Sequence, residues 1–472
     1  MNRKHIIILL MAGILLTVTG CKKYLQVQPT GSYTETQVFA NKTAAQQALN
    51  GLYIDLSENT LYGASLTQTH IELMAQRYRA LVDGVNFYEQ YQQNNYNASQ
   101  AQSNFDVIWK SAYHTIMSAN LFLAQIDGTV QAGVVTAEQG KLMKGEALAI
   151  RALLHFDMLR IFGPVYSLGA NQKSIPYYTV ANGKSQPVIT SSEALAKILE
   201  DLTAAETLLA NDAVIQSGII KQLPDLDFYT NCRNQRLNYF AVKALKARVY
   251  LWGDKKTEAH DAALSVLTEG EKWFPWLPYT AIINTPTPDR IFSTEILFAV
   301  YNRDLYKNHN SFFSPALTET YLLAPDNTNL RNTFENNEND WRFPSTWRQT
   351  NKPFRTFFKY EDISAFQTWG YWQPMIRKSE LYYILAETET DAAKAREYLN
   401  TVRNNRGLNN LAASAVLPAE ILKEYRKEFY GEGQLFFYYK RNNTPSVPDA
   451  MTNGQRSLVY VVPLPLSETT PR

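Results

Sequence analysis

The sequence predicts a mainly α-helical protein, an α-α superhelix of tetratricopeptide-like hairpins with a loop-rich excursion and a few short strands. Residues 144–164 are apolar on nearly every side, have no Gly or Pro between Glu146 and Phe162, and end at Gly163-Pro164. Such a stretch is typical of a helix buried on all sides. Residues 236–268 and 378–406 each consist of a predicted helix, a turn and an Ala-rich helix, the pattern of a tetratricopeptide hairpin.

Charged residues are spread through the central stretch, at Glu146, Arg151, Asp157 and Arg160. They argue against a membrane-spanning helix, because ionised side chains are costly in a bilayer. A buried charge also needs a partner. We therefore expect all four side chains to be paired or hydrogen-bonded to backbone, in a structural role.

The N-terminus resembles a bacterial lipoprotein signal. Basic residues at positions 3–5 precede an apolar run over residues 6–16, and small residues then lead to Cys21. The run is too short to span a bilayer, which takes about 20 apolar residues. We expect residues 1–20 to be removed and Cys21 to be acylated, which anchors the mature chain to a membrane. The alternative is an ordinary signal peptide with a coincidental cysteine.

The predicted mature chain is formally neutral. Removal of residues 1–20 takes two of the 46 Lys and Arg residues and leaves 44, against 44 Asp and Glu. Without a basic block the chain shows no sign of nucleic-acid binding. Cys232 would be the one unmodified thiol, so an internal disulfide is not expected and the fold depends on a large core.

Two regions follow the predicted signal peptide. Residues 21–270 form a helical N-terminal region, with further helices expected at 43–57, 105–127 and about 192–209. Residues 271–472 form a C-terminal region that opens with the loop-rich excursion, at about 271–370. This excursion is rich in Pro, Asn, Thr and aromatic residues. Its best strand candidate is 296–300, and the region closes with a helix at 419–430 and an extended tail at 458–465.

An ordered set of short motifs resembles the SusD/RagB family of nutrient-binding lipoproteins. The central stretch carries Gly145-Glu146-Ala147, Arg151-Ala152, Phe156-Asp157 and Leu159-Arg160. The other matching pieces are Cys21-Lys22-Lys23-Tyr24-Leu25, Ala48-Leu49-Asn50-Gly51-Leu52-Tyr53, Gly431-Glu432-Gly433 and Pro463-Leu464-Pro465. Each piece alone is weak, but their order along the whole chain is specific.

The resemblance implies a fold, a location and a partner. Members of this family build tetratricopeptide-like hairpins with a loop-rich part that holds the ligand. They are lipid-anchored on the outer face of the outer membrane and cap a SusC-like TonB-dependent transporter, to which they deliver oligomeric nutrients. They are not enzymes, so the resemblance implies binding without catalysis and no obligatory cofactor.

Two stretches mix aromatic rings with amides, as a sugar-binding site requires. They are residues 83–97 and 336–372, and the resemblance places ligand residues in the same two zones. The candidate ligand-binding residues are Tyr88, Tyr91, Asn94, Tyr96, Trp341 and Trp347. The alternatives are that these rings pack beneath their own loops or form the transporter-facing surface.

Motifs for catalysis are missing from the sequence. It contains no HExxH, P-loop, GxSxG or GxGxxG. Carboxylates at Asp326, Glu335, Glu338 and Asp340 allow a glycosidase pair or a Ca²⁺ site as alternatives. The leading hypothesis is a glycan-binding surface lipoprotein. The others are a peptide-capturing relative, a helical-repeat adaptor that binds only protein, and a glycoside hydrolase.

Overall fold

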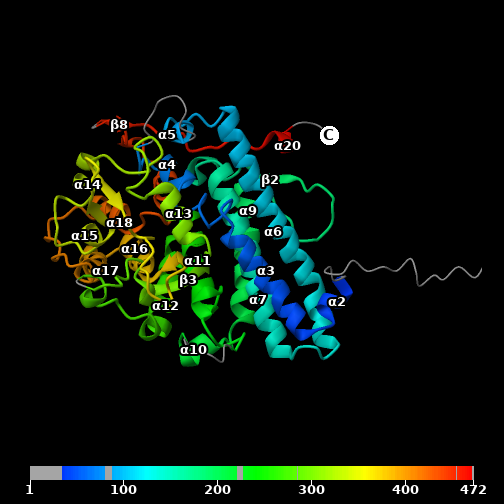
Figure 1. The fold of residues 1–472 in the computed structure, drawn as a ribbon. Helices are drawn as coiled ribbons and strands as arrows, with labels where there is room; N and C mark the ends of the chain where they lie inside the picture. Colours follow the sequence, from blue (N-terminus) through cyan, green and yellow to red (C-terminus); the bar gives the residue numbers. More distant parts are fainter. Residues whose placement is uncertain (1–34, 80–87, 220–226, 284, 453, 470–472) are drawn as a thin grey trace, which may run out of the picture.

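Helical hairpins make up most of the molecule, which is a computed structural model that describes residues 35–79, 88–219, 227–283, 285–452 and 454–469. The predicted signal peptide and Cys21 lie outside the described residues. In Figure 1, α6 and α3 stand on one side of the molecule and α14, α15 and α17 on the other. The N-terminal helices are α2 (Glu35–Phe39), α3 (Lys42–Ser57), α4 (His70–Met74), α5 (Glu89–Gln92), α6 (Ser99–Gln131), α7 (Ala137–Phe162), α8 (Tyr166–Gly169), α9 (Ser191–Leu208) and α10 (Ala213–Ser217).

The central helix α7 is the predicted all-round buried helix. It begins with a capping box, in which the Thr136 hydroxyl accepts from the Gln139 backbone and the Gln139 side chain accepts from the Thr136 backbone. Every residue from Gly145 to Phe162 is buried. The helix packs between α6 and α9, its two principal neighbours. It therefore forms a hairpin with α6.

The four buried charged residues of α7 for which partners were predicted all have one, which confirms the expectation. Glu146 pairs with Arg233 at 2.7 Å, and Arg151 pairs with Asp201 at 2.6 Å. Asp157 accepts from the Tyr62 hydroxyl at 2.6 Å and pairs with Arg160 of the next turn. These contacts leave no bare charge on the buried part of α7.

Two further hairpins follow the predicted plan. They are α11 (Tyr239–Trp252) with α12 (Lys256–Gly270), and α16 (Lys378–Thr388) with α17 (Ala392–Asn404). The turn of the first contains Asp254 in the left-handed conformation, at φ 56°. Short 3₁₀ turns flank this part at η1 (Arg233–Gln235), η2 (Glu271–Trp273), η3 (Tyr279–Ala281) and η4 (Ser293–Glu295).

The loop-rich excursion is held by two-stranded antiparallel pairs. The predicted strand is β3 (Ile296–Tyr301), and its partner β6 (Trp372–Arg377) was not predicted. The other elements of the excursion are β4 (Trp347–Gln349) with β5 (Arg355–Phe357), α13 (Leu305–Phe312), α14 (Asn327–Thr333) and α15 (Arg342–Thr346). A further pair, β1 (Lys173–Pro176) with β2 (Val188–Thr190), lies between α8 and α9. Core side chains on both sides of residue 270 belong to one continuous hydrophobic cluster.

A buried ion-pair network joins the excursion to the C-terminal helices. Glu428, at the end of α18 (Leu417–Glu428), lies between Arg342 at 2.7 Å, Arg406 at 2.7 Å and Arg377. Burial alone would raise the pKa of Glu428, but the three guanidinium groups lower it well below its usual value. The carboxylate therefore stays ionised in the core.

The C-terminal part ends on an extended tail, as predicted. The remaining elements are α19 (Leu435–Arg441), β7 (Val447–Pro448) with β8 (Gln455–Arg456), and α20 (Leu466–Thr469). Helix α19 was missed from the sequence because its run of aromatic residues has little helical periodicity. Among the described residues, none of the helices combines the length and the apolar character needed to cross a membrane.

Candidate ligand-binding cleft

An open cleft of about 600 Å³ runs between α3 and residues 227–236 and ends at Tyr301. Its lining side chains are Gln46, Asn50, Tyr53, Ile54, Asp227, Phe228, Asn231, Cys232, Gln235, Arg236 and Tyr301. We call it the α3 cleft. Its composition is aromatic rings alternating with amides, with one carboxylate and one guanidinium among them.

The sequence of α3 explains why one face of the helix is polar. Ala45, Leu49, Leu52 and Leu56 are buried in the core. The cleft residues of α3 recur at helical spacing on a neighbouring face, at positions 46, 50, 53 and 54. The helix therefore packs with its apolar stripe and presents amides and a tyrosine to the cleft.

Helix α7 fixes the floor of the α3 cleft through Glu146. This carboxylate accepts from the Tyr53 hydroxyl at 2.8 Å and pairs with Arg236 at 3.1 Å and with Arg233 at 2.7 Å. Burial alone would raise the pKa of Glu146, but Arg233 and Arg236 lower it below its usual value. Arg236 also donates to the Asn50 side chain at 2.6 Å.

The guanidinium of Arg236 is consequently engaged before any ligand arrives. It faces Glu146 and Asn50, and lies over the Phe228 ring at 4.1 Å from the centroid. Its positive charge is balanced by a carboxylate and covered by a ring. The α3 cleft thus offers hydrogen bonds and apolar faces rather than a free positive charge.

Three tyrosines continue the cleft across the surface, and we call them the tyrosine platform. The ring centroids of Tyr301 and Tyr371 are 5.4 Å apart, and those of Tyr371 and Tyr306 are 4.6 Å apart. Both pairs are tilted, by 37° and 40°. Tyr301 is 51% exposed and also lines the α3 cleft, so the two surfaces are continuous.

Strand pairing positions the platform. In the β3–β6 register Tyr301 lies opposite Trp372, and the Asn302 backbone donates to the Tyr371 carbonyl at 2.8 Å. A Cβ at Gly370 would lie 2.6 Å from the Tyr306 hydroxyl oxygen, so the loop before β6 packs closely on that ring. Burial raises the pKa of Tyr306 to about 12, so its hydroxyl remains a hydrogen-bond donor even in mildly alkaline solution.

This arrangement suits the recognition of hydroxyl-rich rings. Tyrosine faces offer flat apolar area, and their hydroxyls offer hydrogen bonds. Side-chain amides both donate and accept, as sugar hydroxyls require. The site contains the two kinds of group that a saccharide needs, on neighbouring surfaces.

Three of the predicted ligand-binding residues lie in the core instead. Tyr91 is fully buried, and its hydroxyl accepts from Asn104 at 2.6 Å. Tyr96 is 2% exposed and contacts Phe105, with ring centroids 5.7 Å apart. Trp347 is 1% exposed and packs against Phe357 and Tyr430. These three rings present no face to a ligand in this structure, because Tyr91 and Tyr96 pack on Phe105 of α6 and Trp347 packs on Tyr430.

The other predicted residues are half-buried, and they belong to two separate groups. Tyr88 contacts the His70 ring and Asn94 accepts from Tyr96, both beside α5. Trp341 packs on Tyr279, with centroids 5.1 Å apart. None of these residues lines the α3 cleft. Their contact with ligand stays a prediction.

The sequence did contain a signal for Tyr301. It ends the run ILFAVY, whose other residues are buried, so a ring at the strand end is the one that can project. Tyr306 and Tyr371 had no such signal, because Tyr306 lies in α13 and Tyr371 directly before β6, and long-range pairing of β3 with β6 brings them together.

The carboxylates considered for catalysis or Ca²⁺ are each otherwise engaged. Asp340 pairs with Arg342, Glu338 with Arg355, and Glu335 with two lysines. Asp326 caps α14 by accepting from two backbone N–H groups. Within the part of the chain that the structure describes, no cluster of three or more His, Cys, Asp or Glu side chains is arranged to hold a metal.

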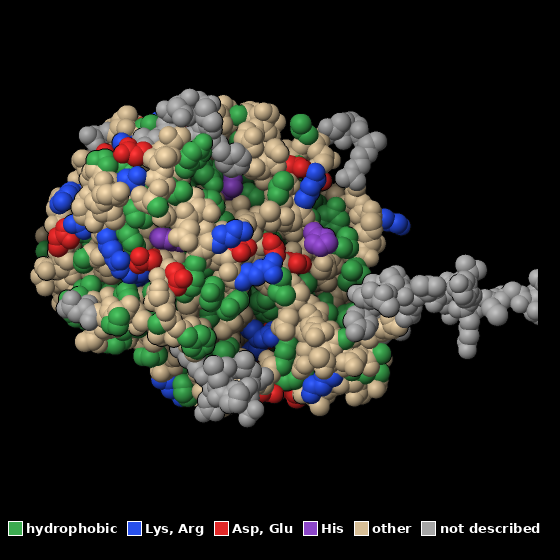
Figure 2. Space-filling view, viewed as in Figure 1, with side chains coloured by type: hydrophobic (Ala, Val, Ile, Leu, Met, Phe, Trp, Pro, Cys, Tyr) green, Lys and Arg blue, Asp and Glu red, His purple; other side chains and the backbone are tan. Residues whose placement is uncertain are grey.

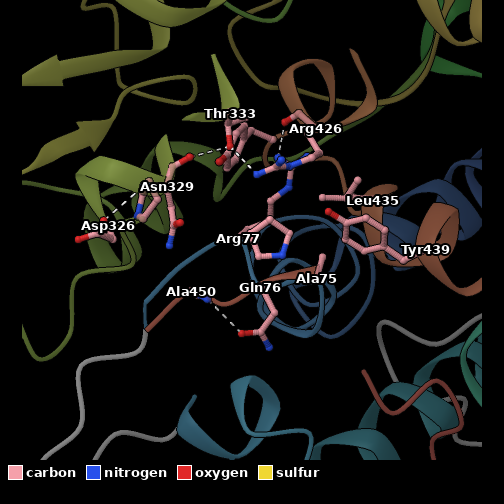
Figure 3. Close-up of a pocket in the computed structure, with 13 residues that line it drawn as sticks. Ala75, Gln76, Arg77, Asp326, Asn329, Thr333, Arg426, Leu435, Tyr439 and Ala450 are labelled. Atoms are coloured by element: carbon pink, nitrogen blue, oxygen red, sulfur yellow. Dashed lines mark hydrogen bonds between the residues drawn. The ribbon is translucent and has the colours of Figure 1, made fainter. Parts of the chain in front are cut away.

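A second hollow, shown in Figure 3, is too small for a saccharide. Its volume is about 20 Å³, close to the smallest space that holds one water molecule. Arg426 points to Thr333 across it, with the guanidinium nitrogen 3.0 Å from the hydroxyl. On the face shown in Figure 2, basic and acidic side chains of the described residues are interspersed, without an extended basic surface.

Two family models match the chain. One, described as starch-binding proteins associating with the outer membrane, matches residues 23–225, and the other, the SusD family, matches residues 296–460. The chain belongs to the SusD/RagB family. This is a family of carbohydrate-binding proteins associated with the outer membrane, and its tetratricopeptide-like helical fold is the predicted fold class.

Individual relatives are distant in sequence but close in fold. A SusD-like protein of Formosa agariphila is 25% identical over 154 residues, which are 32% of this chain and 29% of that protein. A second one matches over 42% of its length, so the chain spans less than half of these curated relatives.

Solved structures match over most of their length. A SusD superfamily protein of Bacteroides fragilis is 19% identical with a TM-score of 0.69, covering 92% of this chain and 98% of that one. A laminarin-binding SusD-like protein is 18% identical with a TM-score of 0.66, covering 91% and 97%.

Proposed function

We propose that this SusD/RagB protein binds oligosaccharide or polysaccharide nutrient across the α3 cleft and the tyrosine platform. The observation that carries the proposal is the continuity of an amide-lined cleft with three tilted tyrosines through Tyr301. The laminarin-binding relative of the same fold supports a glycan ligand. The protein acts by capture, without catalysis and without a metal cofactor.

The proposal includes a membrane anchor and a transporter. Acylated Cys21 holds the protein to the outer membrane, facing outside, and a SusC-like TonB-dependent transporter receives the captured glycan. The lipoprotein-like N-terminal sequence and the outer-membrane family model support this location. Co-purification of a barrel transporter with tagged protein from the native outer membrane tests the partner, and isolation without one argues against it.

Cys232 provides a direct test of ligand binding. It lines the α3 cleft and is half-buried, and a mature chain made without Cys21 has no other thiol. A bound glycan should slow the reaction of Cys232 with a maleimide. We would screen laminarin, starch, xylan and mannan by affinity gel, then measure alkylation with and without each binder.

Two tyrosine variants complete this test. Tyr301→Ala should abolish retardation in the gel and the protection of Cys232. Tyr321→Ala is the matched control, because Tyr321 is 60% exposed and lines neither surface. If the gel retained the protein with no polysaccharide and peptides protected Cys232 instead, the ligand would be a peptide rather than a glycan. Failure of both ligand classes would leave the protein-only adaptor.

A further inference from the structure

A separate pocket lies between α6, the loop joining β1 to β2, and α20. Its volume is about 180 Å³, far more than a single water molecule occupies. It shares no lining residue with the α3 cleft. In Figure 1, β2 and α20 both lie close to α6, although they are far apart in sequence. We call it the α6 pocket.

The wall of the α6 pocket is a cluster of aromatic rings. Tyr113 lies between Trp109 and Tyr178, with ring centroids 4.5 Å and 5.5 Å away. Its hydroxyl donates to the Pro176 carbonyl at 3.0 Å, which fixes the ring. Met117, one helical turn further along α6, extends the apolar wall. Rigid rings of this kind give a preformed stacking surface.

The rim of the α6 pocket carries polar groups from two distant segments. Asn182, Lys184 and Ser185 come from the exposed loop, and Glu468 comes from α20. Lys184 and Glu468 line the same pocket, yet within the described residues neither forms an ion pair closer than 4.0 Å. An ammonium donor and a carboxylate acceptor therefore remain available on one rim.

We propose that the α6 pocket is a second binding site that takes a single pyranose ring, such as a terminal or branching unit of a glycan. The choice of a sugar rests on the proposed function, whereas the existence of the site rests on this pocket alone. A ring with several hydroxyls satisfies the donor and the acceptor together and lays its apolar face on the aromatic wall. A volume of about 180 Å³ has room for one ring, and the rest of a glycan would lie outside the pocket.

The test uses the mature full-length chain and simple probes. Methyl glycosides of glucose, galactose, mannose and xylose are titrated, and saturation-transfer NMR detects binding. At least one should bind in the millimolar range, as expected for so small a ligand. Lys184→Ala and Glu468→Gln should each weaken that binding about ten-fold. Lys141→Ala is the control, because Lys141 is half-exposed and lies outside the pocket.

The two sites are separated by the thiol assay. A methyl glycoside in the α6 pocket should leave the alkylation rate of Cys232 unchanged, and its binding should survive Tyr301→Ala. Binding that is lost in Tyr301→Ala but kept in Lys184→Ala would overturn the proposal, because the sugar would then occupy the α3 cleft. The proposal would also be overturned if none of the four glycosides bound, or if free amino acids bound and the glycosides did not. Either result leaves polysaccharide capture by the cleft untouched.

Discussion

The surroundings of α7 and the surface formed by the α3 cleft and the tyrosine platform use polar groups in opposite ways. Around α7, charged side chains are buried and each has a fixed partner, as with Arg151 and Asp201. On the binding surface the polar groups are mostly amides and hydroxyls, and the charge of Arg236 is balanced by the buried Glu146 carboxylate. Charge thus serves the fold, and neutral hydrogen-bonding groups face the proposed ligand.

The difference separates two kinds of sensitivity. Removal of one member of a buried pair leaves a desolvated charge, which is strongly destabilising. Removal of an exposed ring changes little in the fold. Glu146 belongs to both regions, because it is buried in α7 and holds Tyr53 and Arg236 beneath the cleft. Substitutions should therefore divide into those that unfold the chain and those that only weaken binding.

The largest effect is expected for Arg151→Ala. This change leaves the Asp201 carboxylate without its bidentate partner and also removes a hydrogen bond to Asn120. Loss of such a buried partner costs about 3–5 kcal/mol. Urea unfolding should show it, with glycan preference unchanged in the folded fraction. Arg303→Ala is the control, because Arg303 is 74% exposed. If the Arg151→Ala protein were stable but no longer bound glycan, the division between substitutions that affect folding and those that affect binding would be wrong.

The second effect is a loss of stability in acid. Burial lowers the pKa of His155 to about 3, against about 6.5 in an unfolded chain. The unfolded state therefore binds more protons as the pH falls below about 6.5, and stability declines toward the folded pKa. Between pH 7 and pH 5 this amounts to about 2 kcal/mol. The His155→Gln protein should lose that part of the slope, whereas exchange of the exposed His114 should not. Equal slopes for all three proteins would contradict the assignment.

Much of the scaffold could be predicted because it is periodic. The apolar circumference of α7, the two predicted hairpins and β3 all follow from spacing along the chain. The pairing of Glu146 with a partner could be expected from desolvation alone, although its partner Arg233 could not be named. Helical periodicity and the cost of a bare charge are local rules, so one sequence is enough to apply them.

The sequence predicted which kinds of residue form the ligand surface, but not which individual residues they are. Tyr91 and Tyr306 both lie in short helices, α5 and α13, yet Tyr91 is buried and Tyr306 is on the platform. The difference depends on β6, which brings Tyr371 beside Tyr306 from a distant part of the chain. Long-range strand pairing of this kind leaves no periodic trace in either segment.

A smaller effect is expected on the binding side. Tyr306→Ala should weaken glycan binding by about 1 kcal/mol, or roughly five-fold, because one stacking face of the platform is lost. The ring is half-buried against the core, so the free energy of unfolding in urea should also fall, by about 1–3 kcal/mol, and affinity is measured on the folded protein. Tyr306→Phe is the matched variant, since it keeps the ring and removes only the hydroxyl. Comparable losses for the two variants would mean that the hydroxyl, and not the ring face, carries the contact.

The smallest effect is expected for metal removal. The four carboxylates that sequence composition offered for Ca²⁺ are occupied by arginines, lysines or a helix N-terminus, as in the Glu338–Arg355 pair at 2.7 Å. Glycan affinity measured by titration should therefore be the same in EDTA and in millimolar Ca²⁺. The Glu338→Gln protein should have the same glycan affinity as the unmodified protein, because the Glu338 side chain is half-exposed and lies outside the cleft. A loss of affinity in EDTA that Ca²⁺ restores would show that the ion-paired loops rearrange around a metal. Charged groups would then take part in ligand binding as well as in stabilising the fold.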